Sequence, residues 1–199
     1  MRMMKIVLVA MAAVAAAGCG GPKVQRVDPD STIDLSGRWN DADSRMVSDE
    51  MIGNCMASPW LQRHVDTNNK RPTVIVGLVR NKTSEHIAVD TFIGDMERAF
   101  INSGQVSVVA SAEEREQIRE ERADQQTYAS EETVKQWGRE HGADYMLSGT
   151  ISSIADEEGG EKVVFYQTDL TLIDLQTNEK VWLGQKKIKK YIGRNKVSM

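Results

Sequence analysis

The hydrophobic positions of residues 72–82, PTVIVGLVRNK, form a nearly continuous apolar run rich in β-branched side chains. Such a run is typical of a strand that is buried on both faces, because helices cover each side of the sheet. Pro72 can open the strand, but it lacks the N–H that a central position would need. Gly77 indicates that another element packs closely against the run. We therefore expect a central strand here, with helices on both of its faces.

Apolar residues recur at helical spacing on either side of this strand. The first helix begins at an N-cap at Asn40 or Asp41, because Asp43 then lies in the first turn, where a carboxylate favours the helix dipole. Pro59 and the residue after it mark its end. The second helix ends at Gly104, the residue type favoured just past a helix. The apolar positions are Val47, Met51, Cys55 and Met56 in the first helix and Val89, Ile93, Met96 and Phe100 in the second.

The remaining segments complete an α/β pattern. A short apolar strand at 106–110 follows the second helix, and the order strand, helix, strand predicts a parallel crossover. Ser111 and Glu114 form a capping box that opens a charged helix, and Ser130 caps another helix carrying Val134 and Trp137. Three alternating segments, 145–154, 162–175 and 180–190, are joined by short turns and predict an antiparallel meander. The sequence therefore predicts a single domain with a mixed sheet flanked by helices.

The N-terminus has the pattern of an export signal. Arg2 and Lys5 precede an apolar segment at 6–17 that is too short to span a bilayer and ends in Gly18-Cys19. Ala-Ala-Gly-Cys resembles a bacterial lipobox, in which the cysteine is lipidated and becomes the mature N-terminus. The alternative is an ordinary secretory signal with an incidental cysteine. Gly20 stands where an inner-membrane retention signal usually has aspartate, so the resemblance implies the outer membrane.

These features define three expected regions: a signal peptide at 1–18, a lipidated Cys19 with a flexible tether at 19–35, and a globular domain at 36–199. Without residues 1–18, which carry two basic residues and no acidic one, the chain has 23 basic and 29 acidic residues, a net charge of −6. This balance excludes a simple nucleic-acid binder. With Cys19 acylated, only Cys55 remains, which cannot form an intramolecular disulfide. Its place in a helical apolar pattern predicts a buried thiol.

No catalytic constellation is visible in the sequence. The histidines His64, His86 and His141 are scattered without metal-ligand spacing, and there is no nucleophile elbow or glycine-rich phosphate loop. The acidic run 156–158 precedes two glycines and is typical of a solvated hairpin tip. We therefore expect a protein that is not an enzyme and that uses no cofactor, metal or small-molecule substrate.

Two features are candidates for partner binding. Residues 180–199 carry seven basic and no acidic groups, which indicates either a contact for an acidic partner or an edge strand protected by lysines. Among the tryptophans, Trp137 and Trp182 lie in apolar patterns, whereas Trp39 and Trp60 flank the first helix and are expected to be partly exposed. The candidate contact residues are Trp39, Arg45, Arg119 and Arg122, since tryptophan and arginine are favoured at interface hot spots. The alternatives are packing of Trp39 against the helix start and pairing of the arginines along their acidic helix.

The chain resembles the LpoB family, outer-membrane lipoproteins that activate bifunctional penicillin-binding proteins. The matching stretches span residues 35 to about 190 and are LSGRWNDADSR, RPTVIVGLVRNKTSEHI, ERAFINSG, ASAEEREQIREERADQQ, HGADYMLSGTISSI and EKVWLG. The resemblance implies a domain similar to the N-terminal domain of TolB. It also implies that this domain docks on a regulatory domain of the synthase and stimulates glycan polymerisation and peptide cross-linking. The tether of about 16 residues departs from the long proline-rich tether of enteric members.

Two other functions remain open at this stage. The chain is also compatible with a lipoprotein of another envelope assembly, associated with a flagellum or with secretion, on a similar domain. An envelope enzyme that uses carboxylates not paired in the sequence is the second alternative.

Overall fold

The computed structural model describes residues 24–130, 132 and 140–193. Within these, residues 24–32 belong to a separate unit from the body that starts at Ile33. In the short unit the Asp28 carboxylate accepts a hydrogen bond of 2.8 Å from the N–H of Asp30, which closes a turn. The predicted signal peptide, Cys19 and the helix predicted after Ser130 lie outside the described residues.

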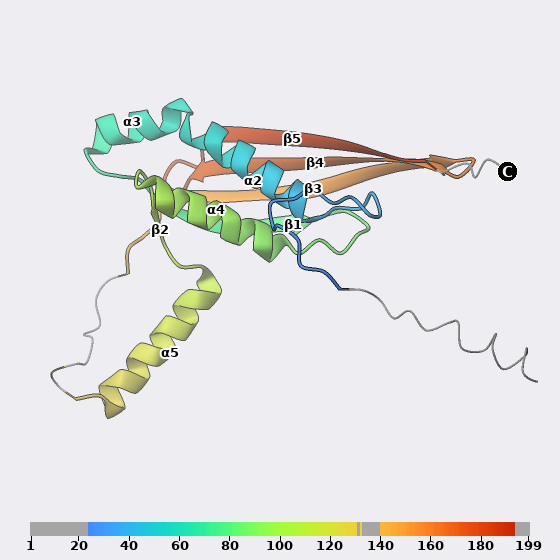
Figure 1. Ribbon diagram of the computed structural model, residues 1–199. Helices are drawn as coiled ribbons and strands as arrows, with labels where there is room; N and C mark the ends of the chain where they lie inside the picture. The colour runs from blue at the N-terminus through green and yellow to red at the C-terminus, as the bar shows by residue number, and fades with distance from the viewer. Residues whose placement is uncertain (1–23, 131, 133–139, 194–199) are drawn as a thin grey trace, which may run out of the picture. The chain divides into compact units, whose positions relative to one another are not determined.

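The body has an α/β fold built on a five-stranded mixed sheet, as predicted. Its helices are α2 (Asp41–Met56), α3 (Pro59–Asn68), α4 (Val89–Ser103) and α5 (Ala112–Tyr128). Its strands are β1 (Thr73–Asn81), β2 (Ser107–Val108), β3 (Tyr145–Glu158), β4 (Glu161–Asp174) and β5 (Lys180–Ile192). The sheet order is β2-β1-β3-β4-β5 (Figure 1). β1 pairs in parallel with β2 and β3, whereas β3, β4 and β5 form the antiparallel meander.

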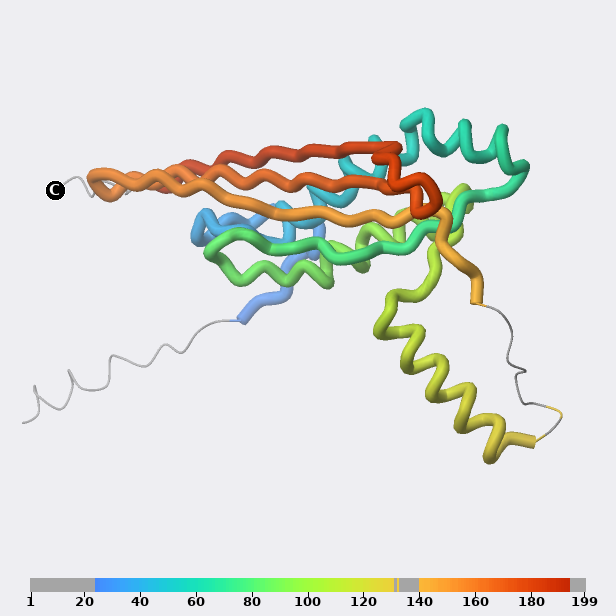
Figure 2. Tube along the Cα trace, turned by 180° about the vertical axis from the view of Figure 1, so that it is seen from behind, coloured from blue at the N-terminus to red at the C-terminus, as the bar shows by residue number. Residues whose placement is uncertain are grey.

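The prediction that helices cover both faces of β1 is wrong. Val74, Val76 and Val79 are buried, but the side chains between them are half-buried or exposed, and Leu78 is 72% exposed. α2 and α4 pack on one face of the sheet, and in Figure 2 the strands β3 to β5 lie nearer the viewer than α2. The pairing of β1 with β3 shifts register between Val76 and Val79, next to Gly77, so the close approach expected there is a bulge against β3.

The first helix of the body begins as predicted but is followed by a second helix that the sequence analysis missed. Asn40 is the N-cap, and its side chain accepts from the Asp43 N–H while the Asp43 carboxylate accepts from the Asn40 N–H. Pro59 follows the end of α2, and it is also the first residue of α3. At this position a backbone N–H would have no partner within the helix, so proline loses no hydrogen bond there. Trp60 is therefore buried at 2% exposure, which corrects the expectation that it is partly exposed.

The long hairpin of β3 and β4 closes at Gly159 and Gly160, both with positive φ, where the acidic hairpin tip was predicted. Along β4 the side chains alternate between buried and half-buried, with Val164, Tyr166, Leu170 and Leu172 buried together. The second strand of the crossover is shorter than predicted and comprises only Ser107 and Val108. The core between the helices and the sheet includes Val47, Met51, Cys55, Trp60, Val74, Val76, Phe92, Met96, Phe100, Leu147, Ile151, Leu170, Leu172 and Trp182.

The charged helix α5 starts with the predicted capping box between Ser111 and Glu114. None of its 17 residues is buried, and the most exposed of its large apolar side chains, Tyr128, is 80% exposed. Local caps and charge pairs, rather than burial, therefore account for this helix. Among the described residues, no helix combines the length and apolarity that crossing a membrane requires.

Candidate partner-binding site

The segment that leads into α2, residues 33–40, is held against β5 and is called the strap below. Lys190 Nζ donates hydrogen bonds to the Asp34 carboxylate at 2.8 Å and to the Arg38 carbonyl at 3.1 Å. Gly37 adopts φ +67°, and a Cβ at this position would collide with the side chain of Ile192. The strap therefore approaches the end of β5 at a position that only glycine fits.

Lys190 is the centre of a small ionic cluster beneath the strap. Its ammonium lies 2.6 Å from the Asp43 carboxylate, and the two side chains are only 12% and 6% exposed. Burial by itself would lower the pKa of Lys190, but the hydrogen bonds to Asp34 and Asp43 outweigh this effect and raise it. The hydrogen bond from Lys190 also lowers the pKa of Asp34. This lysine therefore fixes the strap and the start of α2 to the sheet.

Trp39, the first candidate contact residue, packs into this part of the structure. Its indole N–H donates to Ser44 Oγ at 2.7 Å, and its backbone N–H donates to the Glu85 carboxylate at 3.0 Å. The ring meets Tyr166 edge to face at 5.5 Å between centroids. Tyr166 in turn donates to Glu85 at 2.6 Å. The geometry supports packing against the helix start, and Trp39 is still part-exposed.

Arg45 lies one turn into α2, on the same side of the sheet as Trp39. Its guanidinium is 3.6 Å from the Asp41 carboxylate, an i,i+4 arrangement, and its side chain is 32% exposed. A pair of this kind contributes only about 0.3–0.5 kcal/mol. Arg45 and Trp39 are thus brought together at the start of α2.

Arg119 and Arg122 lie on α5 and share a carboxylate. Arg119 binds Glu140 through two hydrogen bonds of 2.9 and 2.8 Å and also approaches Glu116 at 3.4 Å. Arg122 lies 3.9 Å from Glu140. The hydrogen bond from Arg119 lowers the pKa of Glu140. The two arginines are therefore engaged with carboxylates, as the pairing alternative expected, although their main partner is beyond the helix rather than on it.

The lysines of β5 divide between the two faces of the sheet. Lys186 and Lys190 point toward the helices, where Lys186 pairs with Glu50 and Lys190 with the strap. Lys187 and Lys189 alternate with them, are exposed, and face away from the helices. The basic segment is thus partly a set of structural ion pairs and partly an exposed cationic surface.

The buried titratable groups belong to the core. His64 is 5% exposed, its Nδ1 lies 2.9 Å from the Tyr145 hydroxyl, and its Nε2 has no hydrogen-bond partner within the described part of the chain. Burial lowers the pKa of His64, against the opposing effect of Asp144. Cys55 is fully buried, which confirms the predicted buried thiol, and this burial raises its pKa to about 12. In the region that the structure covers, no group of three or more potential metal ligands occurs.

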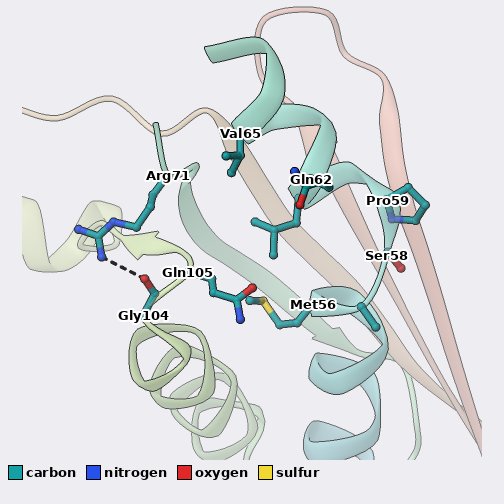
Figure 3. A pocket seen from close by; sticks show the side chains of 10 residues that line it. Met56, Ser58, Pro59, Gln62, Val65, Arg71, Gly104 and Gln105 are labelled. Atoms are coloured by element: carbon teal, nitrogen blue, oxygen red, sulfur yellow. Dashed lines mark hydrogen bonds between the residues drawn. The ribbon is translucent and has the colours of Figure 1, made fainter. Parts of the chain in front are cut away.

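A shallow groove of about 500 Å³ opens between the turn that joins α2 to α3 and the end of α4. Met56, Leu61 and Val65 form its apolar wall, and Gln62 and Gln105 reach into it (Figure 3). Arg71 stands at its rim and donates to the Gly104 carbonyl at 3.1 Å. None of the four candidate contact residues lines this groove.

The family model described as peptidoglycan-synthase activator LpoB matches residues 43–188. The chain belongs to the LpoB family. A search of curated proteins returns no match. The matched range begins within α2 and ends within β5, so it includes α3, α4, α5 and strands β1 to β4 in full and most of α2 and β5.

Solved structures of the LpoB family are among the similar structures. The LpoB C-terminal domain from Salmonella enterica is 17% identical, with 65% of this chain and 93% of that chain covered and a TM-score of 0.34. The NMR structure of E. coli LpoB is 16% identical, with 87% and 84% covered and a TM-score of 0.36. Lipoprotein GNA1162 from Neisseria meningitidis is 13% identical, with 63% and 88% covered and a TM-score of 0.37.

The LpoB match includes three of the four candidate contact residues. Arg45, Arg119 and Arg122 lie inside residues 43–188, whereas Trp39 precedes that range. Lys187 is inside it, and Lys189 and Lys190 follow it.

Proposed function

We propose that this LpoB-family protein is a lipid-anchored periplasmic regulator that binds and activates a bifunctional penicillin-binding protein, a peptidoglycan synthase. The observation that carries the proposal is the match of residues 43–188 to a family of peptidoglycan-synthase activators. The protein acts by binding the synthase directly, and its lipid anchor holds it in the outer membrane.

The anchor rests on the sequence around Cys19, and the tether sets how far the domain reaches. At full extension residues 20–32, which precede the strap, span about 43–47 Å. A relaxed chain of this length spans much less. The domain therefore meets a synthase only where the gap between the outer membrane and the synthase is short.

Replacing Cys19 by alanine should release the protein from the membrane. Stable attachment needs two or more acyl chains, and without the cysteine the protein should be soluble or remain uncleaved. Fractionation of envelopes after a salt wash measures this, with the wild-type protein as the control. A Cys19→Ala protein that still fractionates with the outer membrane would show that acylation is not the anchor.

Activation requires that the protein prefer one state of the synthase over another, because equal binding to both states shifts no equilibrium. The mature chain without Cys19 should therefore raise glycan polymerisation by its cognate synthase and have no effect on peptidoglycan by itself. The contact residues that we propose are Trp39, Arg45, Arg119 and Arg122.

Alanine variants of these four residues should fold normally, and at least one should lose stimulation. Arg45→Ala removes a guanidinium that pairs with Asp41 along α2. Trp39→Ala needs a melting curve beside the activity assay, since it also removes packing on Tyr166. Full stimulation by all four variants would place the contact elsewhere, and a wild-type chain that binds no synthase from its own organism would refute the activator function itself.

A further inference from the structure

The helix α3 is held against the sheet by few side chains. It lies at the end of the sheet where β3 begins and β4 ends (Figure 1). Of its ten residues, only Trp60, Leu61 and His64 are buried. The rings of Trp60 and His64 both meet Tyr145, the first residue of β3, edge to face, with centroid distances of 5.1 and 5.4 Å. A helix with so few buried side chains belongs to the part of a fold that opens locally at low cost.

The buried His64 ring has one nitrogen with a partner and one without. Nδ1 lies 2.9 Å from the Tyr145 hydroxyl, whereas Nε2 has no hydrogen-bond partner among the described residues. Nε2 is 3.9 Å from Asp144 Oδ2, which is beyond hydrogen-bond distance. That carboxylate already accepts hydrogen bonds from the Thr73 N–H at 2.8 Å and from Lys70 Nζ at 3.1 Å. The site therefore suits a neutral imidazole better than an imidazolium, whose two N–H groups both need acceptors.

The surroundings of the ring oppose a proton on it. Burial lowers the pKa of His64 most strongly, and Lys70 lowers it further, whereas Asp144 and Asp174 act in the opposite direction. The Asp174 carboxylate also accepts the backbone N–H groups of two turn residues that follow β4. The titratable and charged groups that act on His64 or on its hydroxyl partner are Arg63 of α3, Lys70 before β1, Asp144 and Tyr145 at the start of β3, and Asp174 at the end of β4.

We propose that His64 is an acid-operated latch, in which the neutral ring holds α3 against the sheet and protonation of the ring releases the helix. The latch goes beyond the function proposed above and does not depend on it. A buried imidazolium without an acceptor at Nε2 is costly, and release of α3 places the charged ring in water. Because Leu61 and Val65 of α3 also form a wall of the groove, releasing the helix removes that wall.

The direction of the pH effect follows from the proton balance between the closed and the released helix. In the closed state the pKa of His64 lies below its ordinary value of about 6.5, so the released state binds the proton more tightly. The closed state therefore keeps its full advantage above a pH of about 6.5 and loses it as the pH falls below that value. Because one proton is involved, the equilibrium between the two states shifts by at most about tenfold per pH unit.

Amide hydrogen exchange of the mature chain between about pH 7.5 and 5 tests the latch. After correction for intrinsic exchange, the amides of α3 should open more as the pH falls, by up to about tenfold per unit, while those of α4 keep their protection. His64→Gln should remove this pH dependence, whereas His86→Gln, which replaces an exposed histidine, should behave as wild type. The latch is overturned by opening of α3 that does not change with pH, that changes equally in both variants, or that changes equally in α4. Stronger protection of α3 in acid also overturns it, since the protonated ring would then close onto Asp144.

Titration of the His64 ring by NMR tests the latch in the wild-type chain, and it decides the question even if His64→Gln does not fold. The ring should titrate below the ordinary pKa of about 6.5. Asp144→Asn keeps an oxygen that can accept from the Thr73 N–H but removes a charge that attracts the proton, so it should lower the pKa of the ring further. A wild-type ring that titrates at or above 6.5 overturns the latch. A ring pKa that Asp144→Asn leaves unchanged or raises contradicts the geometry on which the latch rests and overturns it as well.

Discussion

Val76→Asp should abolish the cooperative unfolding transition of the domain. Val76 is 5% exposed on β1, between the parallel partners β2 and β3, and its side chain faces the core. An ionised carboxylate without a partner is too costly to bury, and the lost packing of the valine adds about 1.5–3 kcal/mol. Together these exceed what a domain with about 5–15 kcal/mol of stability tolerates with its native structure intact.

Leu78→Asp is the matched control for this experiment, since it introduces the same carboxylate two residues away. Leu78 is 72% exposed, so the aspartate stays in water and the free energy of unfolding should change by about 0.5 kcal/mol or less. Thermal or denaturant unfolding followed by circular dichroism measures both variants. A Val76→Asp protein that melts like Leu78→Asp would show that β1 is not central to the core.

Much of this fold follows from local patterns in the sequence. The capping boxes at Asn40 and Ser111 are encoded within four residues, and the helix end at Gly104 by a single residue. The meander follows from alternation and turn residues. Local encoding explains why these elements agree with the structure.

The errors arise where local patterns have two physical interpretations. The apolar run of β1 is compatible with burial on both faces. In the structure, however, the side chains that alternate with the buried Val74, Val76 and Val79 are half-buried or exposed. Pro59 is compatible with the end of one helix and with the first turn of the next. Neither ambiguity can be resolved without knowing what packs against the segment.

The candidate site was predictable only in its residue types. Trp39 and Arg45 stand out by type and position, but the residues that hold them are remote in the sequence. Glu85 accepts from Trp39 across 46 residues, and Lys190 reaches Asp34 across 156. No spacing motif encodes such contacts. The sequence analysis recognised the basic segment of β5 as a whole. The lysines that form ion pairs and those that are exposed alternate along the strand, so they are told apart only once the faces of the sheet are known.

The second large effect concerns the ionic cluster under the strap. Asp43→Ala should lower the free energy of unfolding by about 3 kcal/mol or more. It leaves Lys190, 12% exposed, with the more exposed Asp34 as its remaining carboxylate partner, and it also removes the carboxylate that accepts from the Asn40 N–H. An ion that loses its buried partner keeps its desolvation cost, and a lost cap adds about 1 kcal/mol.

Asp34→Ala is the control, because it removes the other carboxylate from the same lysine. Half of the Asp34 side chain is exposed, so in the variant water can take the place of its carboxylate beside Lys190. The loss of stability should therefore be much smaller than for Asp43→Ala. Denaturant midpoints at constant pH and salt give both values. Equal losses for the two variants would mean that Lys190 depends on both carboxylates alike. If the prediction holds, the buried pair is what positions the start of α2, and Asp43→Ala should also weaken stimulation of the synthase by displacing Trp39 and Arg45.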